Sequence, residues 1–204
     1  MKLPFYKDLK PSKDEASLKI MHTDTNSIDH IAGRLMEALE RISADQPVVV
    51  VCVGTDRSTG DALGPLVGTH LKKFGLKRLH LYGTLENPVH AMNLNETLNT
   101  IFQHFHNPFI IGVDACLGQL TSVGCIQIGD GPVKPGAGVN KELPPVGHMH
   151  VTGIVNVGGF MEYFVLQNTR LSLVMSMAEV IANSFHTALL GRQPRNANSF
   201  AGIE

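Results

Sequence analysis

Several features are scarce or missing in this 204-residue chain, and each excludes a class of protein. The three cysteines lie far apart with no CxxC pair, which argues against a disulfide scaffold and suits a reducing compartment. Charged residues make up 17% of the chain, the formal net charge is −1, and no Lys/Arg cluster resembles a nucleic-acid surface. No apolar run is long enough for a membrane span, and the N-terminus has no hydrophobic signal segment. We therefore expect a cytoplasmic protein whose partners include neither nucleic acid nor membrane.

The residues that are present indicate one globular domain. Hydrophobic residues make up 43% of the chain, and its length suits a single domain with a full-sized core. Charged residues, prolines and serines alternate near the N-terminus without apolar periodicity, which is typical of a flexible segment. We expect a flexible arm over residues 1–26, a single α/β domain over 27–192 and a polar tail over 193–204.

Two kinds of apolar pattern alternate from residue 27 onward. Continuous β-branched runs such as VVVVCV are typical of strands buried on both faces of a parallel sheet, and segments with helical spacing lie between such runs. The predicted strands are 47–54, 78–83, 108–115, 122–130 and 170–177, and the predicted helices are 27–42, 62–75, 91–105, 158–167 and 178–191. Residues 129–150 are rich in Gly and Pro and are expected to form a long loop. This alternation predicts a helix-flanked, mostly parallel sheet.

Two aspartates lie where such a sheet usually binds its ligand. Asp114 closes the predicted strand 108–115, and Asp61 lies between the loop after the first buried strand and the next helix. Ligands of open α/β sheets bind beyond the carboxyl ends of the strands. If the two strands are neighbours, one carboxyl of the pair keeps its proton, so the pair supplies a general acid and a general base. The alternative is that Asp61 caps the helix and Asp114 bonds the amides of a turn.

Other candidate groups carry weaker signals. His148 and His150 lie two residues apart in GHMHVTG, where they are either metal ligands or ordinary packing and surface residues. Cys116 follows Asp114 closely, and a nearby carboxylate raises the pKa of a thiol, which disfavours a cysteine nucleophile. The chain has no GxSxG elbow, no P-loop and no GxGxxG after a strand.

Three segments together resemble the sporulation protein YyaC family of endospore-forming bacteria. They are VVVVCVGTDRSTGDALGPLVG, FIIGVDACLG and GVNKELPPVGHMHVTGIVNVGG. That family is similar to the germination protease that degrades small acid-soluble spore proteins. Asp61 and Asp114 match the positions of the two aspartates of that protease. It is also similar to the hydrogenase maturation proteases, in which an acid, an aspartate and a histidine hold a metal. Asp61, Asp114 and His150, with His148 as the fallback, match those positions. The resemblance implies a three-layer α/β/α sandwich with a mixed, mainly parallel sheet.

The resemblance also implies a function. We expect a spore-associated endopeptidase, located in the sporulating cell or spore, in which Asp61 and Asp114 hydrolyse a protein or peptide substrate without a cofactor. The expected substrate-binding residues are Thr55, Asp56, Gly60 and His150, and a backbone amide between residues 55 and 60 would polarise the scissile carbonyl. One alternative is a divalent metal, zinc or nickel, held by Asp61, Asp114 and His150. The other is a binding factor in sporulation that keeps the cleft without turnover.

Overall fold

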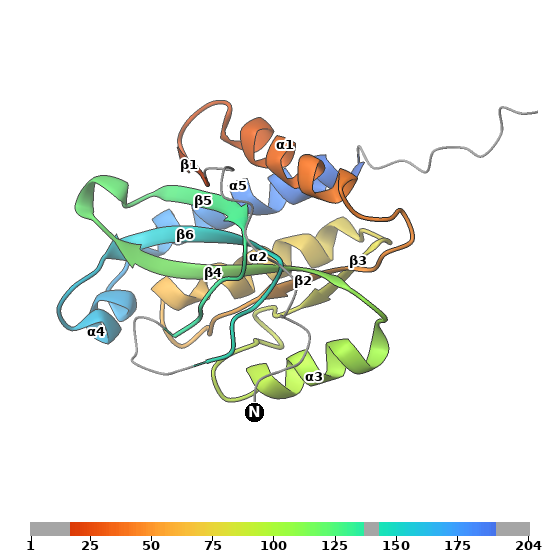
Figure 1. Cartoon of the computed structure of the whole chain (residues 1–204). Coiled ribbons are helices and arrows are strands. Elements are labelled where there is room, and N and C mark those ends of the chain that lie inside the picture. Colours follow the sequence, from red (N-terminus) through yellow and green to blue (C-terminus); the bar gives the residue numbers. More distant parts are fainter. Residues whose placement is uncertain (1–16, 137–142, 191–204) are drawn as a thin grey trace, which may run out of the picture.

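A six-stranded sheet forms the centre of the protein, in a computed structural model that describes residues 17–136 and 143–190 (Figure 1). The strand order is β1-β5-β6-β4-β2-β3. The strands are β1 (Leu18–Met21), β2 (Val48–Cys52), β3 (Leu79–Tyr82), β4 (Phe109–Gly118), β5 (Cys125–Asp130) and β6 (Met149–Val157). Strands β3, β2, β4 and β6 run parallel, whereas β5 is antiparallel to both β6 and β1. The sheet is therefore mixed and mainly parallel, as predicted.

Helices cover both faces of the sheet and complete a three-layer α/β/α sandwich (Figure 1). The helices are α1 (Ser27–Glu40), α2 (Leu63–Phe74), α3 (Leu94–His104), α4 (Glu162–Gln167) and α5 (Leu171–Leu190), with short 3₁₀ turns η2 (Gly60–Ala62) and η3 (Leu120–Ser122). Alternate residues of β2 point to opposite faces: Val48 and Val50 pack with α1, α2 and α5, whereas Val49 and Val51 pack with α3. The strand is thus buried on both faces, as the run VVVVC predicted.

The connections on either side of β2 create a crevice at the carboxyl ends of the strands. The chain leaves β2 through α2 to reach β3 on one side, then returns through α3 on the opposite face to β4, on the other side of β2. Neighbouring strands whose connections depart in opposite directions form a topological switch point, where open α/β sheets bind ligands. Here the switch point lies between β2 and β4.

Four expectations about secondary structure are wrong. Asp114, expected to close its strand, lies inside β4, which continues for four residues to Gly118. Residues 18–21, placed in the flexible arm, form β1 and pair with β5, which supplies a partner that local composition does not reveal. Residues 149–157, without a predicted strand, form β6 between β4 and β5, so the long loop ends at 148. Residues 170–177, predicted as a strand, belong almost entirely to α5, because their apolar residues continue the helical spacing that follows. Residues 1–16 of the expected arm 1–26 and the expected tail 193–204 lie outside the described residues.

Helix α5 has 20 residues and, by length and composition alone, is apolar enough to cross a membrane. This contradicts the expectation that no apolar segment is long enough to span a membrane. The helix packs instead against α1 and α2, with Val174, Ile181 and Phe185 almost fully buried in the shared core. A helix that is apolar around most of its circumference is also typical of the core of a globular domain.

Candidate active site

Asp61 and Asp114 line one cavity of about 320 Å³ at the switch point. Its walls come from the loop after β2, the second half of β4, the segment that follows β5, and α4. The structure therefore brings the two predicted aspartates into one crevice, although they are 53 positions apart in the chain. Their catalytic role stays a prediction.

The loop between β2 and α2 folds back tightly to place Asp61 beneath the end of β2. Gly54 has φ +144°, and a Cβ at this position would lie 2.0 Å from the backbone oxygen of Asp61. The Thr55 N–H donates to that same oxygen at 3.2 Å, and the Gly54 N–H donates to Val89 O at 2.8 Å. Only glycine permits this close approach without displacing the loop. The alternative in which Asp61 caps α2 is not what the structure shows, because Ala62 is the N-cap residue and Asp61 lies within η2.

Asp114 is the more deeply buried carboxyl of the pair, with 8% of its surface exposed. Its Oδ1 accepts a hydrogen bond from the Ala115 N–H at 2.8 Å. Burial raises the pKa of Asp114 well above its ordinary value; the Ala115 amide opposes this shift and the charge of Asp61 adds to it. Asp114 therefore holds its proton to a higher pH than an ordinary aspartate does.

Asp61 is half-buried, and burial raises the pKa of its carboxyl as well. The nearby Ser58 hydroxyl opposes this rise in pKa. Ser58 Oγ is itself buried and has no partner with full hydrogen-bond geometry among the described residues, so we assign it only a weak stabilisation of the Asp61 carboxylate. The two aspartates thus have unequal proton affinities in a shared cavity, which is the arrangement that separates an acid from a base.

Three further ionisable residues line the cavity, and none of them was predicted from the sequence. They are His90 between β3 and α3, Lys134 after β5, and Glu162 at the start of α4. Glu162 also accepts a hydrogen bond from the Gly159 N–H at 3.2 Å. Two of the three, His90 and Glu162, follow the carboxyl ends of parallel strands, and this topological signal could have identified them. Lys134 follows an antiparallel strand and reaches the cavity only through the tertiary fold.

The predicted substrate-binding residues are not gathered in one place. Thr55 lines the aspartate cavity, whereas Asp56 is exposed and lies outside it. Gly60 is buried against α4, where a Cβ would lie 2.7 Å from Leu166 Cδ2. The backbone N–H groups of Thr55 and Arg57 already donate within the loop, so neither is free to polarise a scissile carbonyl.

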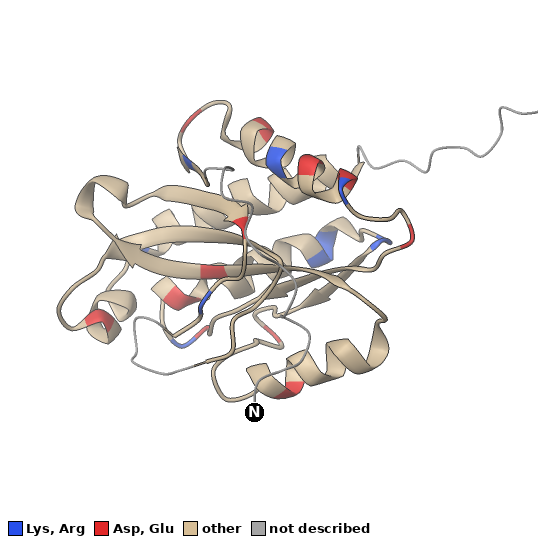
Figure 2. Cartoon of the chain, viewed as in Figure 1, with Lys and Arg blue, Asp and Glu red and all other residues tan. Residues whose placement is uncertain are grey.

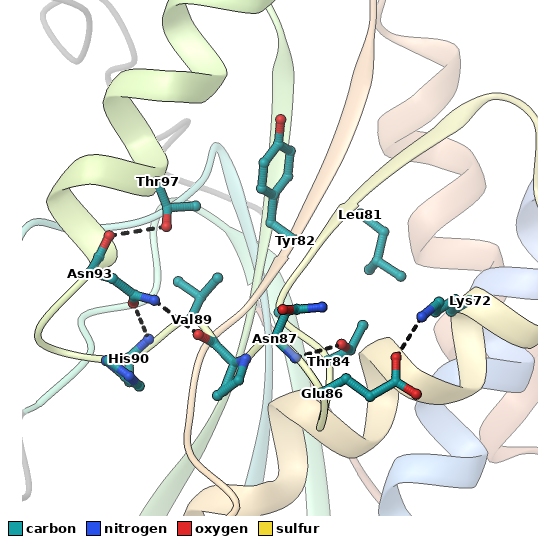
Figure 3. A pocket seen from close by; sticks show the side chains of 12 residues that line it. Lys72, Leu81, Tyr82, Thr84, Glu86, Asn87, Val89, His90, Asn93 and Thr97 are labelled. Atoms are coloured by element: carbon teal, nitrogen blue, oxygen red, sulfur yellow. Dashed lines mark hydrogen bonds and ion pairs between the residues drawn. The ribbon is translucent and has the colours of Figure 1, made fainter.

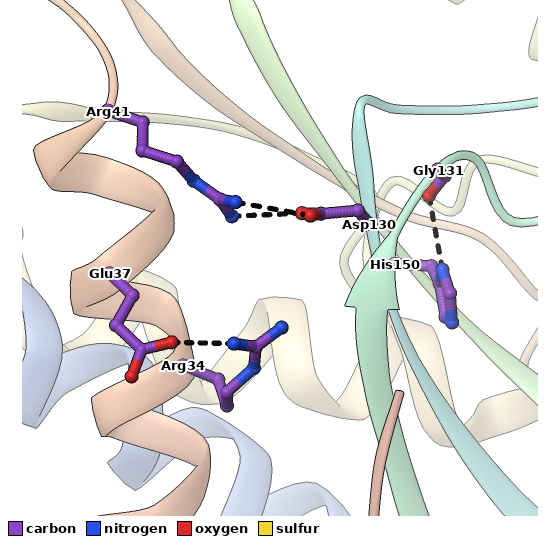
Figure 4. A network of polar contacts seen from close by, with 6 residues as sticks. All are labelled: Arg34, Glu37, Arg41, Asp130, Gly131 and His150. Carbon is purple, nitrogen blue, oxygen red and sulfur yellow. Dashed lines mark hydrogen bonds and ion pairs between the residues drawn. The ribbon is translucent and has the colours of Figure 1, made fainter. Parts of the chain in front are cut away.

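His150 does not line the cavity that holds the two aspartates, so the described residues do not bring together the three ligands of the alternative metal site. It is on β6 opposite Gly112, does not line the cavity, and places its Nδ1 3.1 Å from Gly131 O (Figure 4). No group of three His, Cys, Asp or Glu side chains within 17–136 and 143–190 is placed to hold a metal ion. The fallback residue His148 accepts a hydrogen bond from the Ile110 N–H at 2.9 Å, and burial lowers its pKa, as suits a packed neutral ring.

The surroundings of Cys116 do not favour a thiolate. Cys116 lines the cavity, and burial raises its pKa to about 11. The Thr152 hydroxyl opposes this rise and Asp114 adds to it, so burial rather than the carboxylate is the main cause. A thiol with this pKa is almost entirely protonated near neutral pH and is a poor nucleophile.

The rest of the charge is spread along the described chain. Acidic and basic residues share elements such as α1, and the Arg41 guanidinium bonds both carboxylate oxygens of Asp130 at 3.0 and 3.2 Å (Figures 2 and 4). This pair joins the end of α1 to the end of β5. Its partly exposed position makes it a modest contributor to stability.

These features define a helix-flanked, mainly parallel α/β protein with an aspartate pair at the switch point of its sheet. Residues 19–184 match the family described as "Protein of unknown function (DUF1256)", and the chain belongs to this family. It is 58% identical over 171 residues to the uncharacterized protein YyaC of Bacillus subtilis (strain 168), covering 84% of this chain and 83% of that protein. The predicted relationship to YyaC is confirmed.

A similarity to a solved structure also exists. The crystal structure of the nickel–iron hydrogenase maturation protease HycI from Thermococcus kodakarensis KOD1 matches with a TM-score of 0.48 and 18% sequence identity. The match covers 76% of this chain and 99% of that one. The family assignment rests on the sequence matches alone.

Proposed function

We propose that this protein is an endopeptidase that hydrolyses a protein substrate with Asp61 and Asp114. The observation that carries the proposal is the pair of carboxyl groups in one cavity with unequal proton affinities. Two such groups can serve as general base and general acid in the same turnover.

The roles follow from the burial of each carboxyl. Asp61 is the ionised member and removes a proton from a water molecule, whose oxygen attacks the scissile carbonyl carbon. Asp114 is the protonated member and delivers its proton to the leaving amine as the C–N bond breaks. Asp61 then holds a proton and Asp114 is ionised, and transfer of that proton from Asp61 to Asp114 restores the starting state. The raised pKa of Asp61 makes it a stronger base than an exposed aspartate.

A positive charge is available for the developing oxyanion. Lys134 is exposed and lines the same cavity as the aspartates. Its ammonium group is the candidate that stabilises the oxygen of the tetrahedral intermediate, since the amides of Thr55 and Arg57 are engaged within the loop.

The biological setting belongs to the same proposal. The segments TDRSTGDALGP and GVDA resemble the aspartate-bearing segments of the germination protease of spores. This resemblance supports action during sporulation or germination, inside the sporulating cell or spore. The proposal includes no metal, because His150 lies outside the cavity.

The test is cleavage of a proteome-derived peptide library by purified protein, with products identified by mass spectrometry. Asp61→Asn and Asp114→Asn should each reduce cleavage by about 100-fold or more while circular dichroism shows a retained fold. Asp56→Asn is the matched control, because Asp56 belongs to the same loop but is exposed and outside the cavity. Unchanged cleavage in both cavity variants would refute the mechanism. Peptide capture without any cleavage would instead favour a binding factor.

A further inference from the structure

A second and larger cavity lies at the carboxyl end of β3, beside the aspartate cavity (Figure 3). Its volume is about 620 Å³, and its walls come from the end of β3, the segment 83–90, the start of α3 and Lys72 of α2. We refer to it as the β3 cavity. His90 lines both cavities, so one imidazole belongs to the walls of each.

The partition between the two cavities is thin. Val53 and Gly54 line the aspartate cavity, whereas Val89 lines the β3 cavity. Val53 pairs with Val89 in a parallel β-bridge, and the Gly54 N–H donates to Val89 O at 2.8 Å. Paired backbones are about 4.8 Å apart, and an extended chain advances about 3.3 Å per residue, so about two residues of a bound peptide suffice to pass from one cavity to the other.

The lining of the β3 cavity combines apolar groups, such as Leu81 and Val89, with polar side chains, and its acidic and basic residues oppose each other. Lys72 and Glu86 form an exposed ion pair at 2.6 Å, so their charges cancel. The side chains of Thr84, Asn93 and Thr97 take part in hydrogen bonds of the 84–97 segment (Figure 3). The Tyr82 hydroxyl and the Asn87 side-chain amide make no hydrogen bond within the described parts of the chain, which leaves them available to a ligand. Such groups suit peptide amides and neutral polar side chains.

His90 is held in place between the cavities. Its backbone N–H donates to Asn93 Oδ1 at 2.8 Å, and Asn93 Nδ2 donates to Pro88 O at 3.0 Å. Its Nδ1 accepts from the Met92 N–H at 3.3 Å. A neutral ring whose Nδ1 accepts carries its proton on Nε2, so His90 presents a donor that suits a peptide carbonyl.

We propose that a polypeptide substrate runs from the aspartate cavity past His90 into the β3 cavity, which binds neutral polar residues on one side of the scissile bond. The proposal rests on the endopeptidase function above. An extended peptide is the favoured occupant, because it passes between the two adjoining cavities in about two residues and offers main-chain groups to the Tyr82 hydroxyl, the Asn87 amide and the His90 ring.

The test separates binding from cleavage. Binding is measured with an Asp114→Asn background and a library of peptides of about ten residues, long enough to span both cavities at about 3.3 Å per residue. In that background Thr97→Leu fills the β3 cavity, and Thr100→Leu is the control. The two threonines are matched, because each lies on α3 and donates its hydroxyl to the carbonyl four residues earlier at 3.0 Å, but Thr100 does not line the cavity.

We expect Thr97→Leu to weaken binding about tenfold and to erase the preference for polar residues on one side, with Thr100→Leu unchanged. Tyr82→Phe, which removes one hydroxyl, should weaken binding about 3- to 10-fold, as the loss of one hydrogen bond does. Equal affinity and selectivity in the two threonine variants would overturn the proposal, and so would the absence of any retained peptide.

Cleavage by the wild-type protein is scored on the same library. Peptides that bind in a Thr97-dependent way without being cut would support the β3 cavity and reject the endopeptidase. Peptides that are cut with no dependence on Thr97 would reject the β3 cavity and leave the endopeptidase standing.

Discussion

Replacement of Asp114 by asparagine should make the protein more stable while it removes the proposed activity. Asp114 is buried, and its burial raises the pKa of the carboxyl well above the ordinary value of 3.8. Asparagine has nearly the same shape, cannot ionise, and keeps an Oδ1 that accepts the Ala115 N–H. The substitution therefore removes a buried ionisable group without opening a cavity.

The size of the effect follows from proton linkage. Above pH 3.8 the unfolded chain loses the Asp114 proton while the folded protein retains it, so the native state binds more protons. The free energy of unfolding of the wild type then falls by about 1.4 kcal/mol for each pH unit, up to the pKa of Asp114 in the folded protein. Asp114→Asn lacks this loss. For a chain of this size, the melting temperature of the variant should exceed that of the wild type by about 3 to 6 °C for each pH unit in that window.

The assay is thermal unfolding of both proteins at a series of pH values from about 4 to about 8. The gap in melting temperature should be smallest at the acidic end and should widen as the pH rises. Asp56→Asn serves as the control, because it makes the same substitution at an exposed position outside the cavity. A wild type that gains stability relative to Asp114→Asn as the pH rises would refute the assignment of a raised pKa to this carboxyl.

Three further predictions concern the same cavity. Backbone strain alone should make Gly54→Ala lower the free energy of unfolding by about 1–3 kcal/mol. The total loss should be larger, because the new Cβ would lie 2.0 Å from Asp61 O. Gly131→Ala, with φ +91° but open space around the Cβ, should show only the strain, and equal urea-unfolding losses would contradict the packing argument. Asp61→Asn should lower the pKa of Asp114, because the charge of Asp61 contributes to the raised value. That pKa should still stay above 3.8, because burial is the main cause of the raised value. Carbon-detected NMR titration of the Asp114 carboxyl measures the change. An unmoved titration would show that the two carboxyls are not coupled. Cys116→Ala should retain peptide cleavage within a few-fold in kcat/KM, since its pKa of about 11 leaves almost no thiolate, and a complete loss would reopen a cysteine mechanism.

Local sequence was sufficient for the central elements. The run VVVVC predicted β2, because five consecutive apolar residues match a strand covered on both faces. The positions of Asp61 and Asp114 also followed from sequence, because each comes at or after the end of an apolar run that forms a parallel strand. The prediction that they share a crevice additionally needed β2 and β4 to be neighbours, which only the strand order shows.

Elements that depend on distant partners were beyond local pattern. β1 is a strand because β5 lies beside it, more than 100 positions away, and its own four residues carry no distinctive signal. Residues 170–177 illustrate the reverse case: a short apolar segment fits either a strand or a helix until its neighbours in the core are known.

The members of the cavity were decided by tertiary structure. The sequence alone identified the two carboxyls as candidates, because each follows an apolar run that can be recognised locally, although Asp114 lies inside β4 rather than at its end. The structure places His150 outside the cavity lining, with its Nδ1 near Gly131 O, and adds His90, Lys134 and Glu162 to the lining from segments without a motif. The physical reason is that a site is a meeting of side chains from several elements, and which of them meet depends on strand order, register and the face to which each side chain points.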